Sequence, residues 1–282
     1  MKKLETTTAG RPLPATASKI ILTAEEENRQ ILTVADFMRF YKISASYARK
    51  MISELVRTGW LIRIAKGQYQ LLSAKTGLDP FPMGDKFVLA CQAFPDGFIA
   101  YGSAAEHHGL SLQVFNSVII ANTERSGMRD IGRLSVHLVK VAPTNYLGFQ
   151  SLNRGPSVKV ATLERTLIDC IDRPDLAGGI SDLVELLERG KKRADIEKVI
   201  DLLGSYSSKS LIKKVGFLLE QFDYPLTEAQ TETLLTMSSG VKAYLFSMRL
   251  PGTSKTKYSK KWRLIVNASG FYRKHTAEEE TE

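Results

Sequence analysis

Residues 44–72 read SASYARKMISELVRTGWLIRIAKGQYQLL and join a helix pattern directly to a hairpin pattern. The apolar positions of the first half recur at three- and four-residue spacing, at Ala48, Met51, Ile52 and Leu55. This spacing predicts a helix with one buried face, and Gly59 is a suitable residue to end it. Two apolar runs then flank Lys66-Gly67. Because glycine tolerates the positive φ of a tight turn, the second half predicts a β-hairpin.

Two further helices are expected upstream of this stretch. Residues 18–28, SKIILTAEEEN, are compatible with a first helix, and Thr33 is a suitable N-cap for a short second helix over VADFMRFY. The short connection KIS follows, and Ser44 can cap the third helix. The order helix, helix, turn, helix, hairpin is that of a winged helix-turn-helix, which we assign to residues 16–75.

The third helix of a winged helix-turn-helix enters the DNA major groove, while neighbouring elements hold the phosphates. The polar residues of the helix and the cations of the wing are donors suited to bases or phosphates. The predicted DNA-binding residues are Ser44, Ser46, Tyr47, Arg49, Lys50, Ser53, Arg57, Arg63 and Lys66. We expect Glu54 to face away from the groove. The alternative is a winged helix that binds protein, whose charges only solvate its surface.

The chain has 282 residues, which is more typical of two domains than of one. A flexible leader over residues 1–15 precedes the winged helix, and a Gly- and Pro-containing linker over 76–86 follows it. A larger mixed domain is expected over 87–272, with strands first and helices dominating its second half, and then a disordered acidic tail over 273–282. The expected fold class is therefore α+β.

Composition and cysteine usage favour a cytoplasmic protein. The sequence contains no run of about 18 apolar residues, and its first residues lack the apolar centre of a signal peptide. We therefore expect no membrane partner. Cys91 and Cys170 are far apart and have no CxxC companion, so neither a disulfide framework nor a zinc finger is indicated. Buried free thiols are the simpler interpretation.

The positive charge of the chain is concentrated near its two ends. Residues 240–274 carry 9 Lys and Arg residues and no Asp or Glu. Such a segment, interleaved with Tyr258 and Trp262, suits phosphate contact and base stacking. The candidate contacts to a polyanion or partner are Lys255, Lys257, Lys260, Lys261 and Arg263. The alternative is a solvated loop ahead of a strand that includes Leu264 and Val266.

No constellation of residues indicates an enzyme, a metal site or a cofactor. His107-His108 lacks further ligands at suitable spacing and is better explained as a helix end before Gly109. Arg165 and Asp169 lie one helical turn apart and fit a structural ion pair better than a catalytic pair. Gly178-Gly179 has no phosphate-loop context and predicts a turn between helices.

Five segments, taken in order, give the chain a family resemblance. They are RTGWLIRIAKGQYQLL, YGSAAEHHGLS, VATLERTLIDCIDRPDLAGGISDLVELL, KKVGFLLEQF and LPGTSKTKYSKKWRLIVN. With them the chain resembles the AbiEi antitoxins of type IV toxin–antitoxin systems, which belong to abortive-infection (phage) defence in bacteria. The resemblance implies a winged helix that represses its own operon at inverted repeats. It also implies a C-terminal domain that counteracts a nucleotidyltransferase-like toxin.

Two functions from different classes remain open. The chain is either an antitoxin that also represses its operon, or a stand-alone winged-helix regulator whose larger domain senses a ligand or partner. A neighbouring toxin gene would favour the first. An enzymatic role for the larger domain has no supporting motif.

Overall fold

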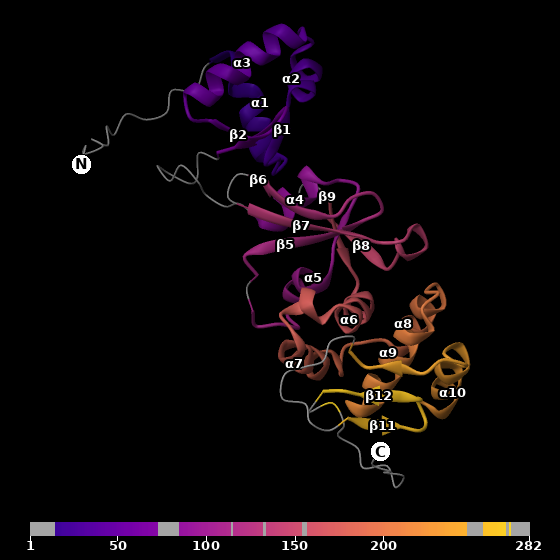
Figure 1. Ribbon diagram of the computed structural model, residues 1–282. Helices are drawn as coiled ribbons and strands as arrows, with labels where there is room; N and C mark the ends of the chain where they lie inside the picture. The colour runs from indigo at the N-terminus through magenta and orange to yellow at the C-terminus, as the bar shows by residue number, and fades with distance from the viewer. Residues whose placement is uncertain are drawn as a thin grey trace, which may run out of the picture.

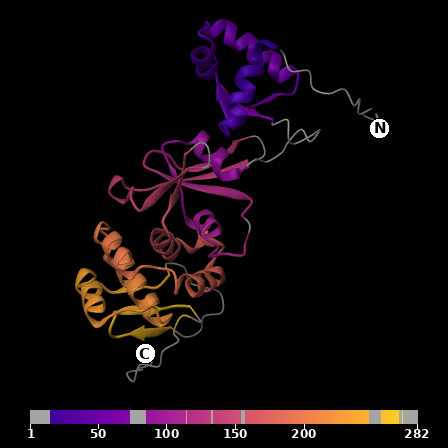
Figure 2. The same cartoon turned by 180° about the vertical axis from the view of Figure 1, so that it is seen from behind.

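The computed structural model describes residues 15–72, 85–113, 115–131, 134–153, 157–246, 256–268 and 271. Three units follow one another along an elongated molecule, with the N-terminal unit and the C-terminal unit at opposite ends (Figures 1 and 2). These units contain both helices and sheets, so the expected α+β architecture is confirmed. No helix in the described part of the chain is long and apolar enough to cross a membrane.

The N-terminal unit has the predicted order of a winged helix-turn-helix. Its elements are α1 (Ala15–Glu26), β1 (Ile31–Thr33), α2 (Val34–Tyr41), α3 (Ala45–Arg57), β2 (Leu61–Ala65) and β3 (Gln68–Leu71). Thr33 and Asp36 form a capping box at the start of α2, and the Ser44 hydroxyl accepts from the backbone N–H of Tyr47 at the start of α3. After α3, Gly59 adopts φ +78°, as expected of a residue just beyond a helix end. The predicted caps and hairpin are thus confirmed.

A small sheet in the order β1-β3-β2 closes this unit. Strand β1 pairs antiparallel with β3, so Ile31-Leu32 belongs to the wing sheet, a strand that the sequence interpretation missed. The buried face of α3 packs with α1, Phe37 of α2 and Trp60 into one apolar core. As the spacing predicted, that face consists of Ala48, Met51, Ile52 and Leu55.

The middle unit is a six-stranded mixed sheet in the order β6-β7-β5-β4-β9-β8. Its strands are β4 (Phe98–Ile99), β5 (Ser117–Asn122), β6 (Gly127–Ile131), β7 (Leu134–Lys140), β8 (Phe149–Asn153) and β9 (Ser157–Ala161). Strand β5 runs parallel to β7, and β4 runs parallel to β9. Helix α4 (Lys86–Ala93) packs on the face toward the N-terminal unit, and α5 (Tyr101–His107) and α6 (Leu163–Asp172) pack on the other face (Figure 1).

The C-terminal unit combines helices with a second small sheet. The helices are α7 (Ile180–Gly190), α8 (Ile196–Gly204), α9 (Lys209–Gln221) and α10 (Glu228–Met237). The strands are β10 (Ala243–Tyr244), β11 (Lys257–Ser259) and β12 (Leu264–Val266), in the order β10-β12-β11. Short 3-10 turns, η2 (Pro143–Asn145) and η3 (Pro174–Ala177), connect elements earlier in the chain. The capping box of Thr227 and Gln230 on α10 is confirmed.

Residues 85–271 contain two hydrophobic cores. One core lies in the middle sheet under α4 and α5, and the other joins α6–α10 to the second sheet. Of the boundaries predicted for this region, the linker 76–86 lies outside the described residues apart from Asp85 and Lys86, and the acidic tail lies wholly outside them. The division into these domains stays a prediction.

Several single residues occupy the places predicted for them. Cys91 and Cys170 are buried and unbridged. Gly109 follows the end of α5 with φ +65°, and the His108 ring packs within 2.7 Å, Nε2 to oxygen, of the Ala161 carbonyl. Burial is the main cause that lowers the pKa of His108. Gly178 and Gly179 make the left-handed turn before α7. Within the described residues, no cluster of His, Cys, Asp or Glu could hold a metal ion.

Candidate nucleic-acid interface

Helix α3 presents its polar face to solvent on the side opposite its buried face. Every predicted contact residue of this helix and its cap is exposed: Ser44, Ser46, Tyr47, Arg49, Lys50, Ser53 and Arg57. Tyr47 is 49% exposed. Within the described part of the chain, neither Arg49 nor Lys50 takes part in an ion pair with another side chain. These side chains share the face that a winged helix turns to the major groove.

Ser44 and Glu54 differ from the other residues of this face in how their side chains are used. The hydroxyl of Ser44 accepts a hydrogen bond from the backbone N–H of Tyr47. This side chain therefore stabilises the first turn of α3. Glu54 bonds Arg57 through two N–H groups, with Nε to Oε2 at 3.0 Å. This hydrogen bond is the main cause that lowers the pKa of Glu54. Glu54 therefore pairs with Arg57, one of the predicted contact residues, and neutralises its charge.

The hairpin exposes both predicted wing cations. Arg63 on β2 and Lys66 at the turn are solvent-accessible, and Gly67 adopts φ +77° in the turn. Ile64, next to Arg63, is partly buried and packs against the core of the middle sheet, and β2 lies close to β6. Ile64 therefore faces the middle unit, while Arg63 beside it is exposed to solvent. The wing is anchored at its base and charged on its outer side.

The N-terminal unit is fixed to the middle unit through β1 and α4. The backbone N–H groups of Gln30 and Ile31 both donate to Oε1 of Gln92 on α4, at 3.0 and 2.7 Å. Ile31 is buried in the core of the middle sheet. As a result α3 lies at the free end of the molecule, and the wing sheet lies between α3 and the rest of the chain (Figure 1). The predicted DNA-binding face is therefore turned away from the other two units.

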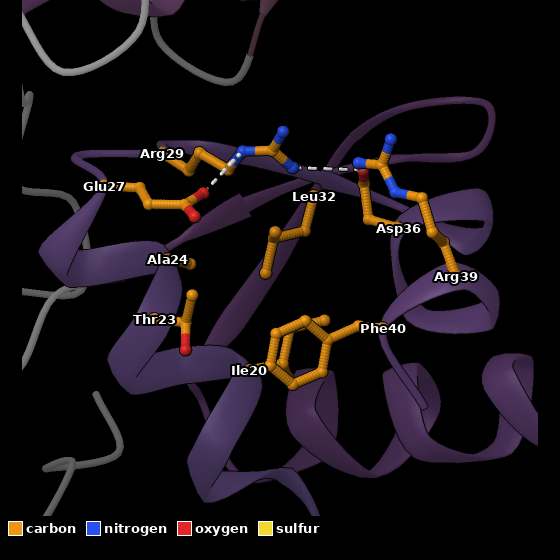
Figure 3. A pocket seen from close by; sticks show the side chains of 9 residues that line it. All are labelled: Ile20, Thr23, Ala24, Glu27, Arg29, Leu32, Asp36, Arg39 and Phe40. Carbon is orange, nitrogen blue, oxygen red and sulfur yellow. Dashed lines mark hydrogen bonds and ion pairs between the residues drawn. The ribbon is translucent and has the colours of Figure 1, made fainter. Parts of the chain in front are cut away.

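A hollow of about 220 Å³ lies in the N-terminal unit, between α1, β1 and α2. Figure 3 shows that its apolar floor is overhung by Arg29, which reaches toward Glu27 and Asp36. Arg29 pairs with both carboxylates at 3.1 Å, and Arg39 pairs with Asp36 at 3.3 Å. Two guanidinium groups are thus balanced by two carboxylates. None of the predicted DNA-binding residues lines this hollow.

The basic C-terminal segment is only partly available to a ligand. Lys257, Lys260, Lys261 and Arg263 are exposed, while Lys255 lies outside the described residues. Lys261 pairs with Glu220 of α9. Trp262, expected to stack on a ligand, is 1% exposed, and its Nε1 donates to Glu220 at 2.6 Å. The expectation of stacking by Trp262 was wrong, because its ring packs over Gly216, where an added Cβ would lie 2.3 Å from Cη2.

The predicted ion pair on α6 is confirmed and is buried. Arg165 Nε lies 2.8 Å from Asp169 Oδ1, and both side chains are almost fully excluded from solvent. The Nη1 group of Arg165 also donates to the carbonyls of Asn145 and Leu147, at 2.6 and 2.9 Å. The guanidinium therefore ties the loop after η2 to α6. These contacts support a structural role for the pair.

The matched family covers the unit that carries the exposed α3 face. Residues 19–72 match the family model described as "Transcriptional regulator, AbiEi antitoxin". The N-terminal unit is an AbiEi domain. The match spans all of the winged helix-turn-helix from within α1 to the end of β3, so the resemblance in the sequence is confirmed for this unit.

The fold beyond the AbiEi domain is also found in a solved structure. The RV2827C protein from Mycobacterium tuberculosis is similar over 91% of this chain and 93% of that chain, with a TM-score of 0.62 and 18% sequence identity. At that identity the likeness shows the fold. No curated protein matches the sequence. The three units of this chain thus form an arrangement that exists in at least one other protein.

Proposed function

We propose that the protein is a transcriptional regulator that binds duplex operator DNA through α3 and the wing of its AbiEi domain. The observation that carries the proposal is the face of α3 at the free end of the molecule, where Arg49 and Lys50 are exposed. Both lie in the first half of the helix, as base-reading residues of helix-turn-helix proteins do. The family match to transcriptional regulators supports the same role.

The finer proposal is that the operator is an inverted repeat in front of the protein's own operon, which also encodes a nucleotidyltransferase-like toxin. In this view the middle and C-terminal units counteract that toxin. The family description of the AbiEi domain as an antitoxin supports the proposal. Co-expression with the product of the adjacent gene tests it, because an antitoxin restores growth that the toxin alone arrests. Growth that stays arrested would favour a stand-alone regulator.

The DNA-binding proposal is tested by titrating operator DNA with matched variants. Each lost base contact costs about 1–3 kcal/mol, so the double variant Arg49→Ala/Lys50→Ala should bind its operator at least tenfold more weakly. Lys66→Ala should weaken operator and unrelated duplexes equally and reduce the log–log salt slope by about one. Fluorescence anisotropy between about 50 and 200 mM salt measures both effects.

Lys192→Ala is the matched control for this titration. Lys192 is an exposed lysine between α7 and α8, far from α3, so its removal changes net charge without touching the interface. Its operator affinity should equal that of the wild type. A folded double variant with unchanged operator affinity would exclude α3 as the reading helix.

A further inference from the structure

Strand β1 has three residues, and each of them has a different role in the packing. Ile31 is buried in the core of the middle unit, and Leu32 is buried in the core of the AbiEi domain. Thr33 ends the strand and is also the N-cap of α2. Because side chains alternate along a strand, β1 contributes to two cores at once. A displacement of this strand would therefore affect both units.

Helix α4 of the middle unit holds β1 through the backbone. The N–H groups of Gln30 and Ile31 donate to the same atom, Oε1 of Gln92, at 3.0 and 2.7 Å. The other polar group of this amide, Nε2 of Gln92, is buried and makes no hydrogen bond of ordinary geometry within the described residues. The side-chain oxygen is therefore the part of Gln92 that holds the strand.

The far end of β1 belongs to the helix-turn-helix. Thr33 and Asp36 form the capping box that starts α2, and the N–H of Thr33 donates to Oδ2 of Asp36 at 2.8 Å. Phe37, one residue further along α2, is part of the core that buries one face of α3. The position of β1 thus sets where α2 begins, and α2 packs against α3.

The same strand also supports the wing. Strand β1 pairs antiparallel with β3, so that Thr33 lies opposite Gln68, the first residue of β3. Gln68 directly follows the wing turn Lys66-Gly67. At the other end of β3, the N–H of Leu71 donates to the carbonyl of Gln30 at 2.8 Å. Strand β1 therefore joins α2 to the wing, the two elements next to α3 in the proposed DNA interface.

We propose that Gln92 is a positioning residue for operator binding, although it lies outside the AbiEi domain. By fixing β1, its side-chain oxygen keeps the start of α2 and the base of the wing in the arrangement that binds duplex DNA. Gln92 acts through β1 and does not itself contact DNA. The inference rests on the proposed function, and it goes further by giving the middle unit a role in DNA binding.

The test measures operator affinity and amide exchange in the full-length protein. Gln92→Met keeps the length of the side chain and removes the hydrogen-bond acceptor. The amides of residues 30 and 31 then lose their partner, so hydrogen–deuterium exchange at these two positions should be faster than in the wild type. Coupling between two sites typically changes affinity by a factor of about 5–150, so operator affinity should fall about fivefold or more.

The salt dependence separates positioning from direct contact. Gln92→Met changes no charge and removes no phosphate contact, so the log–log salt slope of operator binding should equal that of the wild type. Gln92→Glu is the conservative variant, because a carboxylate oxygen accepts strongly from backbone N–H groups. It should retain most of the operator affinity. If Gln92→Glu bound as weakly as Gln92→Met, the acceptor would have no role in positioning.

Gln113→Met is the matched control. Gln113 is an exposed glutamine in the loop after α5, and α5 packs on the face of the middle sheet opposite α4. Operator affinity and amide exchange at residues 30 and 31 should equal those of the wild type. If Gln92→Met does not fold, Gln92→Asn is the second variant. It withdraws the acceptor by one methylene group, and both effects are expected in the same direction.

Three results would overturn the inference. One is unchanged operator affinity in Gln92→Met although amide exchange at residues 30 and 31 is faster. Another is unchanged exchange at these two residues, because Gln92 would then not hold β1. The third is a salt slope reduced by about one, which would show that a phosphate contact has been lost and that the middle unit binds DNA directly.

The double variant Arg49→Ala/Lys50→Ala distinguishes a failure of this inference from a failure of the proposed function. Unchanged operator affinity in the double variant would contradict the proposed function. Weakened affinity in the double variant, together with unchanged affinity in Gln92→Met, would contradict only the role of Gln92.

Discussion

Glu54 is the one carboxylate on α3, and its pairing with Arg57 shapes the charge of the proposed DNA-binding surface. Residues 54 and 57 are neighbours on a helix surface, so the pair forms within one turn. The side chain of Arg57 is 72% exposed and that of Glu54 is 45% exposed, and such surface pairs add little to stability. If α3 binds DNA as proposed, the pair matters more for binding than for stability, because it keeps a negative charge beside the predicted contact residues.

We expect Glu54→Gln to strengthen DNA binding. The substitution removes a negative charge and releases Arg57 for a phosphate, so operator affinity should rise severalfold and the salt slope should steepen by about one. Anisotropy titrations against salt measure both quantities. Glu232→Gln, an exposed glutamate on α10, is the matched control. A weaker operator complex would instead show that Glu54 accepts a hydrogen bond from a cytosine, as glutamate does in some interfaces.

At the scale of an element, α6 is held by the buried pair of Arg165 and Asp169. Asp169 Oδ2 and the Tyr206 hydroxyl are both buried, and within the described residues neither makes a hydrogen bond of ordinary geometry. The guanidinium lies 5.3 Å from the Tyr206 ring centroid and also bonds the loop after η2. The pair therefore connects α6 to two other parts of the chain.

Breaking this pair from one side should be more harmful than removing both partners. Arg165→Met leaves a buried carboxylate without its cation and should cost about 3–5 kcal/mol in the free energy of unfolding. The double variant Arg165→Met/Asp169→Leu should cost less than the sum of the two single variants. Urea denaturation of the four proteins gives the coupling energy. Additive single effects would show that the two charges do not depend on each other.

The same pair predicts a pH dependence with a defined sign. Burial raises the pKa of Asp169 from 3.8 to about 6, although Arg165 opposes the shift. The folded state thus holds the proton more tightly than the unfolded chain. The stability that this carboxyl contributes is fully present below about pH 4 and is lost as pH rises through about 6.

Asp169→Asn should remove that dependence. The difference in unfolding free energy between the wild type and the variant, measured by urea denaturation at a series of pH values, should shift against the wild type as pH rises between about 4 and 6. It should be constant above pH 7. A shift toward the wild type over the same range would mean that Arg165 outweighs burial and that the pKa is depressed.

The sequence predicted long elements better than short ones. Helices such as α3 and α9 repeat apolar residues over several turns, so their patterns identify them. Strand β4 has two residues, too few for any alternation to appear. Strand β6, GMRDI, is an edge strand with exposed central residues and carries no apolar run. These strands exist because their neighbours pair with them, which a local pattern does not record.

The exposure of the polar face of α3 was predictable from the sequence, and the burial of Trp262 was not. The face of α3 follows from helical spacing alone, because the apolar residues identify the opposite face. The burial of Trp262 depends on Gly216 and Glu220, which are distant in sequence and belong to α9. The register of Tyr244 with Ile265 likewise depends on β10 running parallel to β12, a pairing between segments that are distant in sequence.

At the scale of the whole molecule, the proposed DNA-binding face of α3 and the other two folded units are separated along its length. The six-stranded sheet and the C-terminal unit have cores of their own, and few residues of the AbiEi domain enter them. A domain that buries its own core can fold alone. The contacts of Ile31 and Gln92 join the AbiEi domain to the core of the next unit, and Ile31 is the buried residue that this domain adds to that core.

A fragment of residues 81–282 should accordingly stay folded and lose operator affinity. Its near-ultraviolet circular dichroism should retain the signal of fixed aromatic packing, while anisotropy should show no specific DNA binding. A fragment that unfolds would place the domain boundary elsewhere.

The contact of Gln92 with the backbone of residues 30 and 31 also limits how such proteins could be recombined. The side-chain oxygen of Gln92 accepts hydrogen bonds from main-chain N–H groups. These two bonds therefore do not depend on which side chains residues 30 and 31 carry. A chimera could therefore take its DNA-reading module from a relative of different operator preference, joined within residues 73–84. The acceptor at position 92 and a residue of similar size to Ile31 would have to be kept.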